Sequence, residues 1–131
     1  MEFEHTTYNG TRLRQVHILP EGVWETPITI IGAGGIGSTT AMILAKMGAK
    51  DLTVYDFDTV SEHNIASQMY GLDDIGEQKT EALKLNIFEA TGIGIQTKGK
   101  AEELPNEGIV ILALDSMDER IRLINQAKEK F

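Results

Sequence analysis

Hydrophobic residues in this chain occur in short runs separated by glycine-rich or polar stretches. The first run, residues 28–31, is apolar and β-branched, which predicts a strand buried on both faces. After a glycine cluster, apolar residues recur with helical periodicity until Gly48, which is placed to end a helix. The expected inward face of this helix comprises Ile36, Thr40, Ile43, Leu44 and Met47. A strand, a glycine turn and a helix are therefore predicted in succession.

The same reasoning predicts a second strand at 52–55, a helix from about 77 to 90, a weak strand at 93–97 and an apolar strand at 109–113. The expected inward residues of the second helix are Ala82, Leu83, Ile87 and Ala90, and those of a final helix are Met117, Ile121, Ile124 and Ala127. Strands that alternate with helices favour parallel pairing with right-handed crossovers. The predicted fold class is α/β, a Rossmann-like three-layer sandwich with a mainly parallel sheet.

Composition narrows the class of protein. The 131 residues, 41% hydrophobic and 24% charged, are typical of one globular domain. A net charge of −8 argues against a nonspecific grip on nucleic acid. No apolar run is long enough to span a membrane and the polar amino terminus is not signal-like, so a cytoplasmic protein is expected. The lack of cysteine excludes disulfides, thiolate metal ligands and a cysteine nucleophile within the chain.

The glycine cluster is the first candidate binding site. Gly32, Gly34 and Gly37 have GxGxxG spacing between the predicted strand and helix, where backbone can approach a phosphate closely. The amides of this turn, those of Gly35 and Ile36 included, would face the anion. A glycine-rich turn without a ligand is the structural alternative.

Asp56 ends the second predicted strand, where a carboxylate can accept hydrogen bonds from ribose hydroxyls. The glycine turn and this carboxylate together favour a nucleotide. They do not separate ATP from NAD, and the turn taken alone points first to a dehydrogenase.

Further motifs follow in a fixed order. The stretch DFDTVSEHN runs from Asp56 to Asn64 and is followed by Gln68, then by DIGEQK from Asp74 to Lys79. With the glycine turn, Asp115 and Arg120, these motifs resemble the ThiF/MoeB family, which is similar in turn to the adenylation domains of ubiquitin-activating enzymes. The resemblance extends from Ile28 to about Asn125.

The resemblance implies ATP and Mg²⁺ as cofactors and gives each motif residue a role. Asp56 would hold the ribose, Asn64 and Lys79 would lie over the triphosphate, and Asp115 would bind Mg²⁺. Lys79 would offset the negative charge that accumulates as pyrophosphate leaves. Asp58 belongs to the same nucleotide loop.

Each of these residues also has a purely structural interpretation. Asn64 could be a turn residue, Lys79 a solvated lysine at a helix start, and Asp58 the side chain of an Asx turn. Asp115 could cap the last helix. Arg120, next to Glu119, could form only a surface ion pair.

The amino-terminal segment adds one catalytic candidate. Residues 1–26 are expected to form an arm, and Arg14 resembles the family arginine that reaches into the neighbouring subunit's nucleotide site; Arg12 is a second candidate. This implies a homodimer. An ordinary exposed arginine is the alternative.

The implied function is an adenylyltransferase domain that activates the C-terminal carboxylate of a small ubiquitin-like or sulfur-carrier protein. Residues 27–131 would be the ATP-binding half of an incomplete family domain. Ser67 stands where the family has an arginine, which puts turnover in doubt more than binding. Two alternatives stay open: a non-catalytic nucleotide-binding or scaffold module, and an NAD-binding oxidoreductase half-domain.

Overall fold

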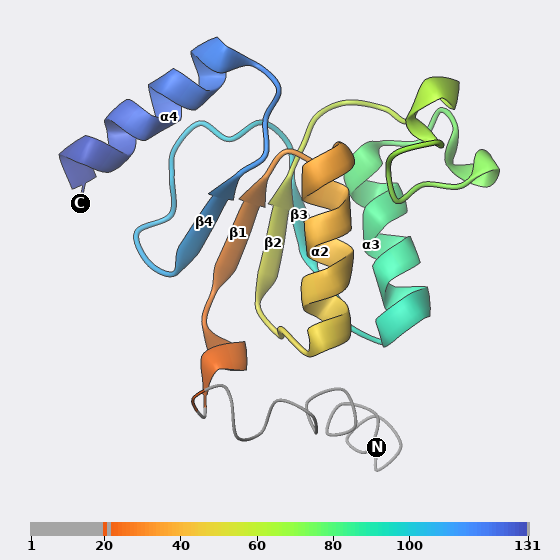
Figure 1. Ribbon diagram of the computed structural model, residues 1–131, viewed down its shortest axis with the longest axis horizontal. Helices are drawn as coiled ribbons and strands as arrows, with labels where there is room; N and C mark the ends of the chain where they lie inside the picture. The colour runs from red at the N-terminus through yellow and green to blue at the C-terminus, as the bar shows by residue number, and fades with distance from the viewer. Residues whose placement is uncertain (1–19, 21, 131) are drawn as a thin grey trace.

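The computed structural model describes residue 20 and residues 22–130. In this part of the chain four parallel strands form one sheet in the order β3-β2-β1-β4. The strands are β1 (Ile28–Ile31), β2 (Leu52–Tyr55), β3 (Gln96–Lys98) and β4 (Ile109–Leu112). In Figure 1 all four arrowheads point to the same edge of the sheet, so the strands' carboxyl ends meet there.

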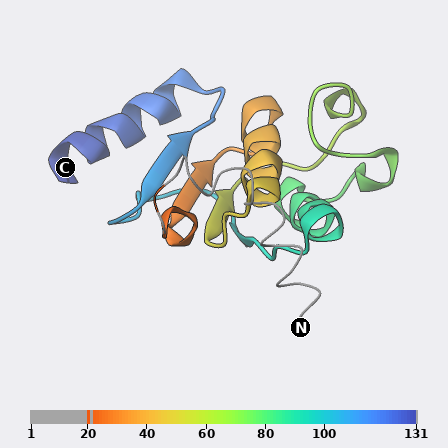
Figure 2. The same ribbon diagram turned by 60° about the horizontal axis from the view of Figure 1, so that its bottom comes forward.

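Three α-helices connect or follow the strands: α2 (Gly35–Met47), α3 (Lys79–Thr91) and α4 (Met117–Lys130). Short 3-10 turns are η2 (Val23–Glu25), η3 (Glu62–Asn64) and η4 (Leu72–Asp74). Both ribbon views place α4 on the β4 side of the sheet, away from α2 and α3 (Figures 1 and 2). None of the helices described here has the length and apolar character needed to cross a membrane.

The two faces of the sheet support two separate apolar cores. Alternation along β1 places Ile28 and Ile30 in the core shared with α2 and α3, and Ile31 in the core shared with α4. Leu123 of α4 is fully buried in this second core. Helices on both faces of a parallel sheet make three layers, and the predicted α/β Rossmann-like fold is confirmed.

The predicted inward face of α2 is only partly correct: Leu44 packs against the first core, and Thr40 and Met47 are half-buried. Small residues line the buried side of this helix, including Gly37, Ala41 and Ala45, whereas Ile36 and Ile43 are exposed. The helix starts in a tight turn directly after β1, so small residues fit best against the sheet there, and Met42 is the one larger apolar residue among the buried positions of α2. Ile36 and Ile43 lie on the outer side.

The predicted inward face of α4 is correct only at Ala127. Met117, Ile121 and Ile124 are exposed, and the contacts to the core come from Leu123 and Ala127. Polar residues on the same helix bind the backbone of residues 101–104, and these bonds fix which side of α4 turns inward.

Two element boundaries differ from the prediction. The helix expected from about 77 begins at Lys79, with Gln78 as its N-cap, and its predicted inward residue Ala90 is exposed. The weak strand expected at 93–97 is β3 at Gln96–Lys98. Ile93 and Ile95 are buried in the first core without strand pairing, so their apolar character reflects core packing.

Candidate nucleotide-binding site

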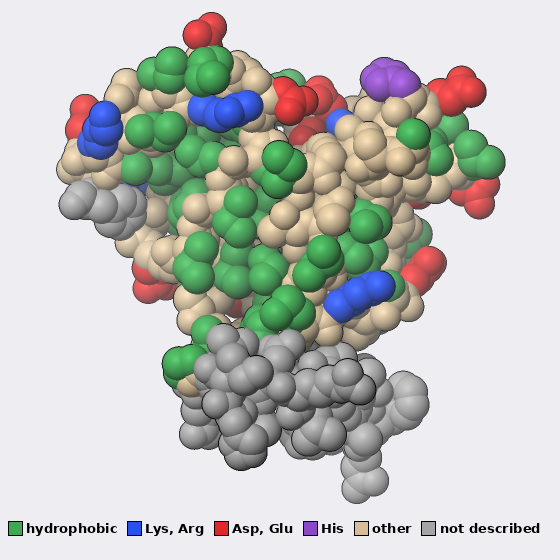
Figure 3. All heavy atoms as spheres, in the orientation of Figure 1, with side chains coloured by type: hydrophobic (Ala, Val, Ile, Leu, Met, Phe, Trp, Pro, Cys, Tyr) green, Lys and Arg blue, Asp and Glu red, His purple; other side chains and the backbone are tan. Residues whose placement is uncertain are grey.

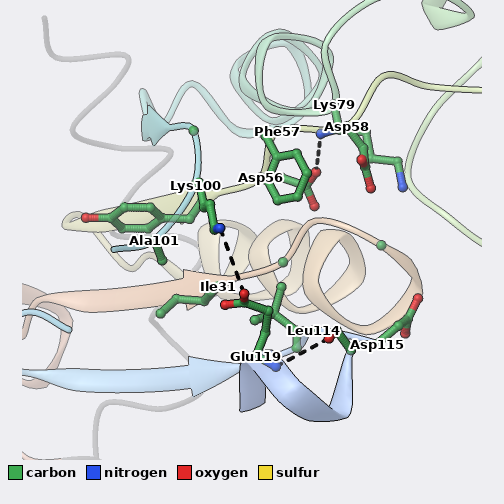
Figure 4. A pocket seen from close by; sticks show the side chains of 16 residues that line it. Ile31, Asp56, Phe57, Asp58, Lys79, Lys100, Ala101, Leu114, Asp115 and Glu119 are labelled. Carbon is green, nitrogen blue, oxygen red and sulfur yellow. Dashed lines mark hydrogen bonds and ion pairs between the residues drawn. The ribbon is translucent and has the colours of Figure 1, made fainter. Parts of the chain in front are cut away.

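A cavity of about 300 Å³ lies at the carboxyl ends of the strands. The turn after β1, the ends of β2 and β4, the start of α3 and the segment after β3 form its walls (Figure 4). Six of the predicted residues line it, namely Gly32, Gly34, Asp56, Asp58, Lys79 and Asp115. Ligands of open α/β sheets bind at this edge.

The glycine turn is held close to neighbouring backbone. Gly32 has φ 108°, a left-handed conformation, and a Cβ built on it would meet the Ala113 carbonyl at the end of β4. A Cβ on Gly37 would overlap the carbonyl oxygen of Gly32. The motif glycines therefore permit the tight turn and the close packing of α2 that the sequence predicts.

The start of α2 leaves backbone amides available. The Ser38 amide donates to the Gly34 carbonyl at 2.9 Å, which closes the first turn of the helix. The amides of Gly35, Ile36 and Gly37 precede that bond, and such first-turn amides lack intrahelical acceptors. Neither Gly35 nor Ile36 lines the cavity, and the Ile36 side chain is 71% exposed.

Asp56 ties the glycine turn to the loop after β2. One carboxylate oxygen accepts from the Ala33 amide at 2.7 Å and the other from the Asp58 amide at 2.7 Å. The Asx-type turn thus uses Asp56, and its earlier assignment to the side chain of Asp58 is wrong. Because each carboxylate oxygen can accept more than one hydrogen bond, Asp56 keeps acceptor capacity toward the cavity.

Lys79 is the first residue of α3 and is only 7% exposed. Its backbone amide donates to the Asp58 carbonyl at 2.9 Å. Its ammonium has no hydrogen bond or ion pair within the described residues, although the side chain lines the cavity beside Asp58 (Figure 4). A lysine side chain that lines a cavity in this way suits an anionic ligand.

The predicted phosphate residue Asn64 does not line the cavity. It is buried at the end of η3, where its side-chain oxygen accepts from the Ser61 amide at 2.8 Å and from the Ser61 hydroxyl at 3.0 Å. The structure thus places Asn64 as a residue that orders the loop. Gln68 lies nearby, with its side-chain nitrogen 3.8 Å from a Cβ built on Gly34, and its buried side-chain oxygen has no partner in the described part of the chain.

Asp115 follows β4, is exposed and lines the cavity. It does not cap α4, because the Ser116 hydroxyl accepts from the Glu119 amide at 3.3 Å. Arg120 donates to the Leu114 carbonyl at 2.6 Å and to the Asp115 carbonyl at 3.4 Å. The suggested Arg120–Glu119 ion pair is therefore wrong, and Arg120 instead supports the backbone that carries Asp115.

The opposite end of the cavity contains residues that the sequence did not single out. Ile31, Ala101 and Leu114 make this end apolar, and Lys100 reaches across it to Glu119 at 3.9 Å. Figure 4 shows this ion pair at the end remote from Lys79, Asp58 and Asp115. Hydrogen bonding from Arg122 holds the pKa of Glu119 below its ordinary value. No local motif marks these residues, because segments far apart in the chain bring them together.

The described residues contain no group of three His, Cys, Asp or Glu side chains able to hold a metal ion by themselves. Asp115 supplies a single hard oxygen donor on the cavity that Lys79 also lines. This donor set fits Mg²⁺, which takes one or two protein carboxylates together with phosphate oxygens. Arg12 and Arg14 lie outside the described residues.

A family model described as ThiF family matches residues 21–130 of the chain. The chain belongs to this family. Residues 21–130 include every element that forms the cavity, so the suspected resemblance is confirmed.

Two relatives that are similar in sequence support this assignment. The ubiquitin-like modifier-activating enzyme 5 of Oryza sativa subsp. japonica is 37% identical over 82% of the chain and 30% of its own length. The molybdopterin-synthase adenylyltransferase of Haemophilus influenzae is 30% identical over 81% of the chain and 47% of its own length. The chain thus spans less than half the length of these curated relatives.

Solved structures share the fold. The tRNA N6-threonylcarbamoyladenosine dehydratase of Escherichia coli superposes with a TM-score of 0.79 at 22% identity, over 92% of this chain and 56% of that one. Escherichia coli MccB, solved with AMPCPP and MccA, gives a TM-score of 0.72 at 24% identity, over 80% of this chain and 34% of that one.

Proposed function

We propose that this chain is an ATP- and Mg²⁺-dependent adenylyltransferase domain that activates the C-terminal carboxylate of a small ubiquitin-like or sulfur-carrier protein. The observation that carries the proposal is Lys79, whose ammonium has no partner among the described residues and whose side chain lines a cavity that also receives the glycine turn. A triphosphate would give this ammonium an anionic partner.

Each lining residue has a role in this proposal. Asp56 accepts from the ribose, and the amides at the start of α2 bind phosphate oxygens. Lys79 stabilises the charge that develops on the departing pyrophosphate, and Asp115 holds Mg²⁺ against the phosphates. When bound, Mg²⁺ supplies charge stabilisation and orientation for in-line attack at the α-phosphate. The carboxylate of the carrier protein is the nucleophile, so no side-chain nucleophile is needed.

The comparisons support adenylyl transfer over hydride transfer. The named relatives include an adenylyltransferase and a ubiquitin-like modifier-activating enzyme, and MccB was solved with an ATP analogue.

Asn64 contributes to the site by ordering the loop between β2 and α3. The proposal also includes a cytoplasmic homodimer in which Arg14 completes the partner's site.

Calorimetry tests the ligand. Wild-type protein is expected to bind ATP with Mg²⁺ in preference to NAD⁺. Lys79→Ala is expected to weaken ATP binding by about tenfold or more, because a hydrogen bond to a charged group is lost. Lys84→Ala removes an exposed lysine from the same helix and serves as the matched control. Preference for NAD⁺, or unchanged ATP affinity in Lys79→Ala, would refute the assignment.

A non-catalytic nucleotide-binding module is the second candidate, and Ser67 favours it. This residue is exposed, with its backbone carbonyl near Gly35, and stands where the family arginine is expected. ATP–pyrophosphate exchange in the presence of a carrier protein ending in Gly-Gly separates the two candidates. We expect exchange by the wild type and a rate higher by about 10²-fold in Ser67→Arg, since a transition-state donor is restored. Binding of ATP without exchange in either protein would leave only the non-catalytic module.

A further inference from the structure

A polar stripe on α4 holds the segment that follows β3. We define this stripe as Glu119, Arg122, Gln126 and Lys130, which recur at three- and four-residue spacing along one side of the helix. The Gln126 side chain donates to the Glu102 carbonyl and accepts from the Leu104 amide, and Lys130 donates to the Leu104 carbonyl at 2.8 Å. The segment from 99 to 106 has no strand or helix of its own, so these bonds define its path.

Arg122 makes the bonds of the stripe that lie nearest the cavity. Its guanidinium donates to the Ala101 carbonyl at 2.7 Å and to the Glu102 carbonyl at 3.0 Å. Glu119 accepts two bonds from the same guanidinium, at 3.0 and 2.8 Å, and so fixes its plane. Arg122 itself does not line the cavity, so it acts on the cavity only through the backbone of Ala101 and Glu102.

The segment that Arg122 holds is the wall of the apolar end of the cavity. Gly99, Lys100 and Ala101 line that end, and Lys100 pairs with Glu119. The polar end, with the glycine turn, Lys79 and Asp115, suits phosphates, and Asp56 lies between the two ends (Figure 4). A planar and largely apolar base therefore fits the end that this wall closes.

We propose that Arg122, oriented by Glu119, is a positioning residue for the nucleotide base: it sets the wall at residues 99–101 against which the base packs. This inference rests on the proposed nucleotide binding. It adds that base recognition depends on a residue outside the cavity, whereas recognition of the triphosphate does not.

The test compares two ligands by calorimetry in the presence of Mg²⁺: ATP, and inorganic tripolyphosphate, which has no base. Arg122→Met keeps much of the side-chain length and removes the guanidinium. We expect it to weaken ATP binding about tenfold, because the wall loses charge-assisted hydrogen bonds. Affinity for tripolyphosphate is expected to stay within about twofold of wild type, because the phosphate end is untouched.

Lys130→Met is the matched control. It removes one positive charge from the same stripe and frees the same segment at Leu104, which, unlike Ala101, does not line the cavity. Its ATP affinity is expected to stay within about twofold of wild type. Should Arg122→Met prove unfolded in a thermal melt, Arg122→Lys provides a milder change, because lysine keeps the positive charge but lacks the planar guanidinium, with the same selective weakening of ATP.

The outcomes separate this inference from the function on which it rests. Equal weakening of both ligands, no weakening of ATP, or the same loss in Lys130→Met would overturn the role of Arg122 while leaving nucleotide binding intact. Failure of the wild type to bind either ligand would instead remove the proposed function, and the inference with it.

Discussion

Single residues decide how closely the glycine turn approaches a ligand. Gly32 and Gly37 have no room for a side chain, because neighbouring carbonyl groups occupy the Cβ positions. Gly35 differs, since a Cβ there would meet only the Ser67 carbonyl at an ordinary 3.7 Å. The motif therefore contains glycines with different physical roles.

Alanine substitutions distinguish these roles. Gly37→Ala is expected to lower the free energy of unfolding by about 2 kcal/mol or more, because backbone must shift to relieve the overlap with Gly32. Gly35→Ala, in the first turn of α2, is expected to be neutral or stabilising by up to about 1 kcal/mol. Urea unfolding of both variants measures this. Equal stability of the two would contradict the close packing of α2 on the turn.

The sequence predicted those site residues whose roles are local. The glycine spacing, the acid at the end of β2 and the acid after β4 each occupy a position where the chain itself specifies the geometry. For Asn64 the structure supports the turn residue rather than the phosphate ligand that the resemblance implied, and the role of Arg122 could not be predicted in this way. Arg122 binds a carbonyl 21 residues earlier in the chain, and nothing in the local pattern marks that contact.

At the scale of elements, the loop between β2 and α3 is fastened to the glycine turn. The Tyr70 hydroxyl donates to the Ala33 carbonyl at 2.6 Å, and the Met69 amide donates to the Ser38 hydroxyl at 3.1 Å. Tyr70 is buried, and this burial raises the pKa of its hydroxyl above the ordinary value of 10.0, with smaller contributions from Asp56 and Asp74.

The raised pKa of Tyr70 makes stability depend on pH. Above pH 10.0 the tyrosine ionises in the unfolded chain but stays protonated in the folded one, so the unfolded state binds fewer protons and stability falls as pH rises. Tyr70→Phe is expected to cost about 1 kcal/mol near neutral pH and to reduce this alkaline loss. Urea unfolding at about pH 8 and about pH 11 measures both effects.

Tyr55→Phe is the control for the alkaline effect. Tyr55 is half-buried on the other face of the sheet, and no hydrogen bond of its hydroxyl is found within residues 20 and 22–130. Its substitution is expected to leave the alkaline loss unchanged. If wild type and Tyr70→Phe lose the same amount of unfolding free energy at alkaline pH, the Tyr70 hydroxyl is not buried and hydrogen-bonded as described.

The existence and order of the elements could be predicted, but only part of the inward faces of α2 and α4. The period of the apolar residues and the positions of the glycines indicated each strand and helix, because both reflect local backbone geometry. Which side of a helix turns inward depends on its partners. The space against the sheet selects small residues on α2, and the polar stripe selects the orientation of α4.

At the scale of the whole molecule, the charge of the cavity indicates that a cation must accompany the nucleotide. The chain carries a net charge of −8, and the cavity has carboxylates at Asp56, Asp58, Asp115 and Glu119 against the ammonium groups of Lys79 and Lys100. A triphosphate added to this site would increase the excess of negative charge. A divalent cation at Asp115 is therefore expected to accompany the nucleotide.

The surface also shows an apolar face. In Figure 3 apolar side chains gather over β4 and β1, and the exposed residues on this side of the sheet include Ile43 and Ile109. No helix within the described part of the chain covers this face beside α2. The sequence could not predict this exposure, because the spacing of the apolar residues is the same whether or not another element or another protein covers them.

The most direct measurement is a crystal structure of the protein with Mn²⁺ and a non-hydrolysable ATP analogue, with the metal located by its anomalous signal. The triphosphate is expected between the glycine turn and Lys79, the metal on the Asp115 carboxylate, and the base against Ala101. A nucleotide bound elsewhere, or a triphosphate that contacts neither Lys79 nor the amides of α2, would contradict the account.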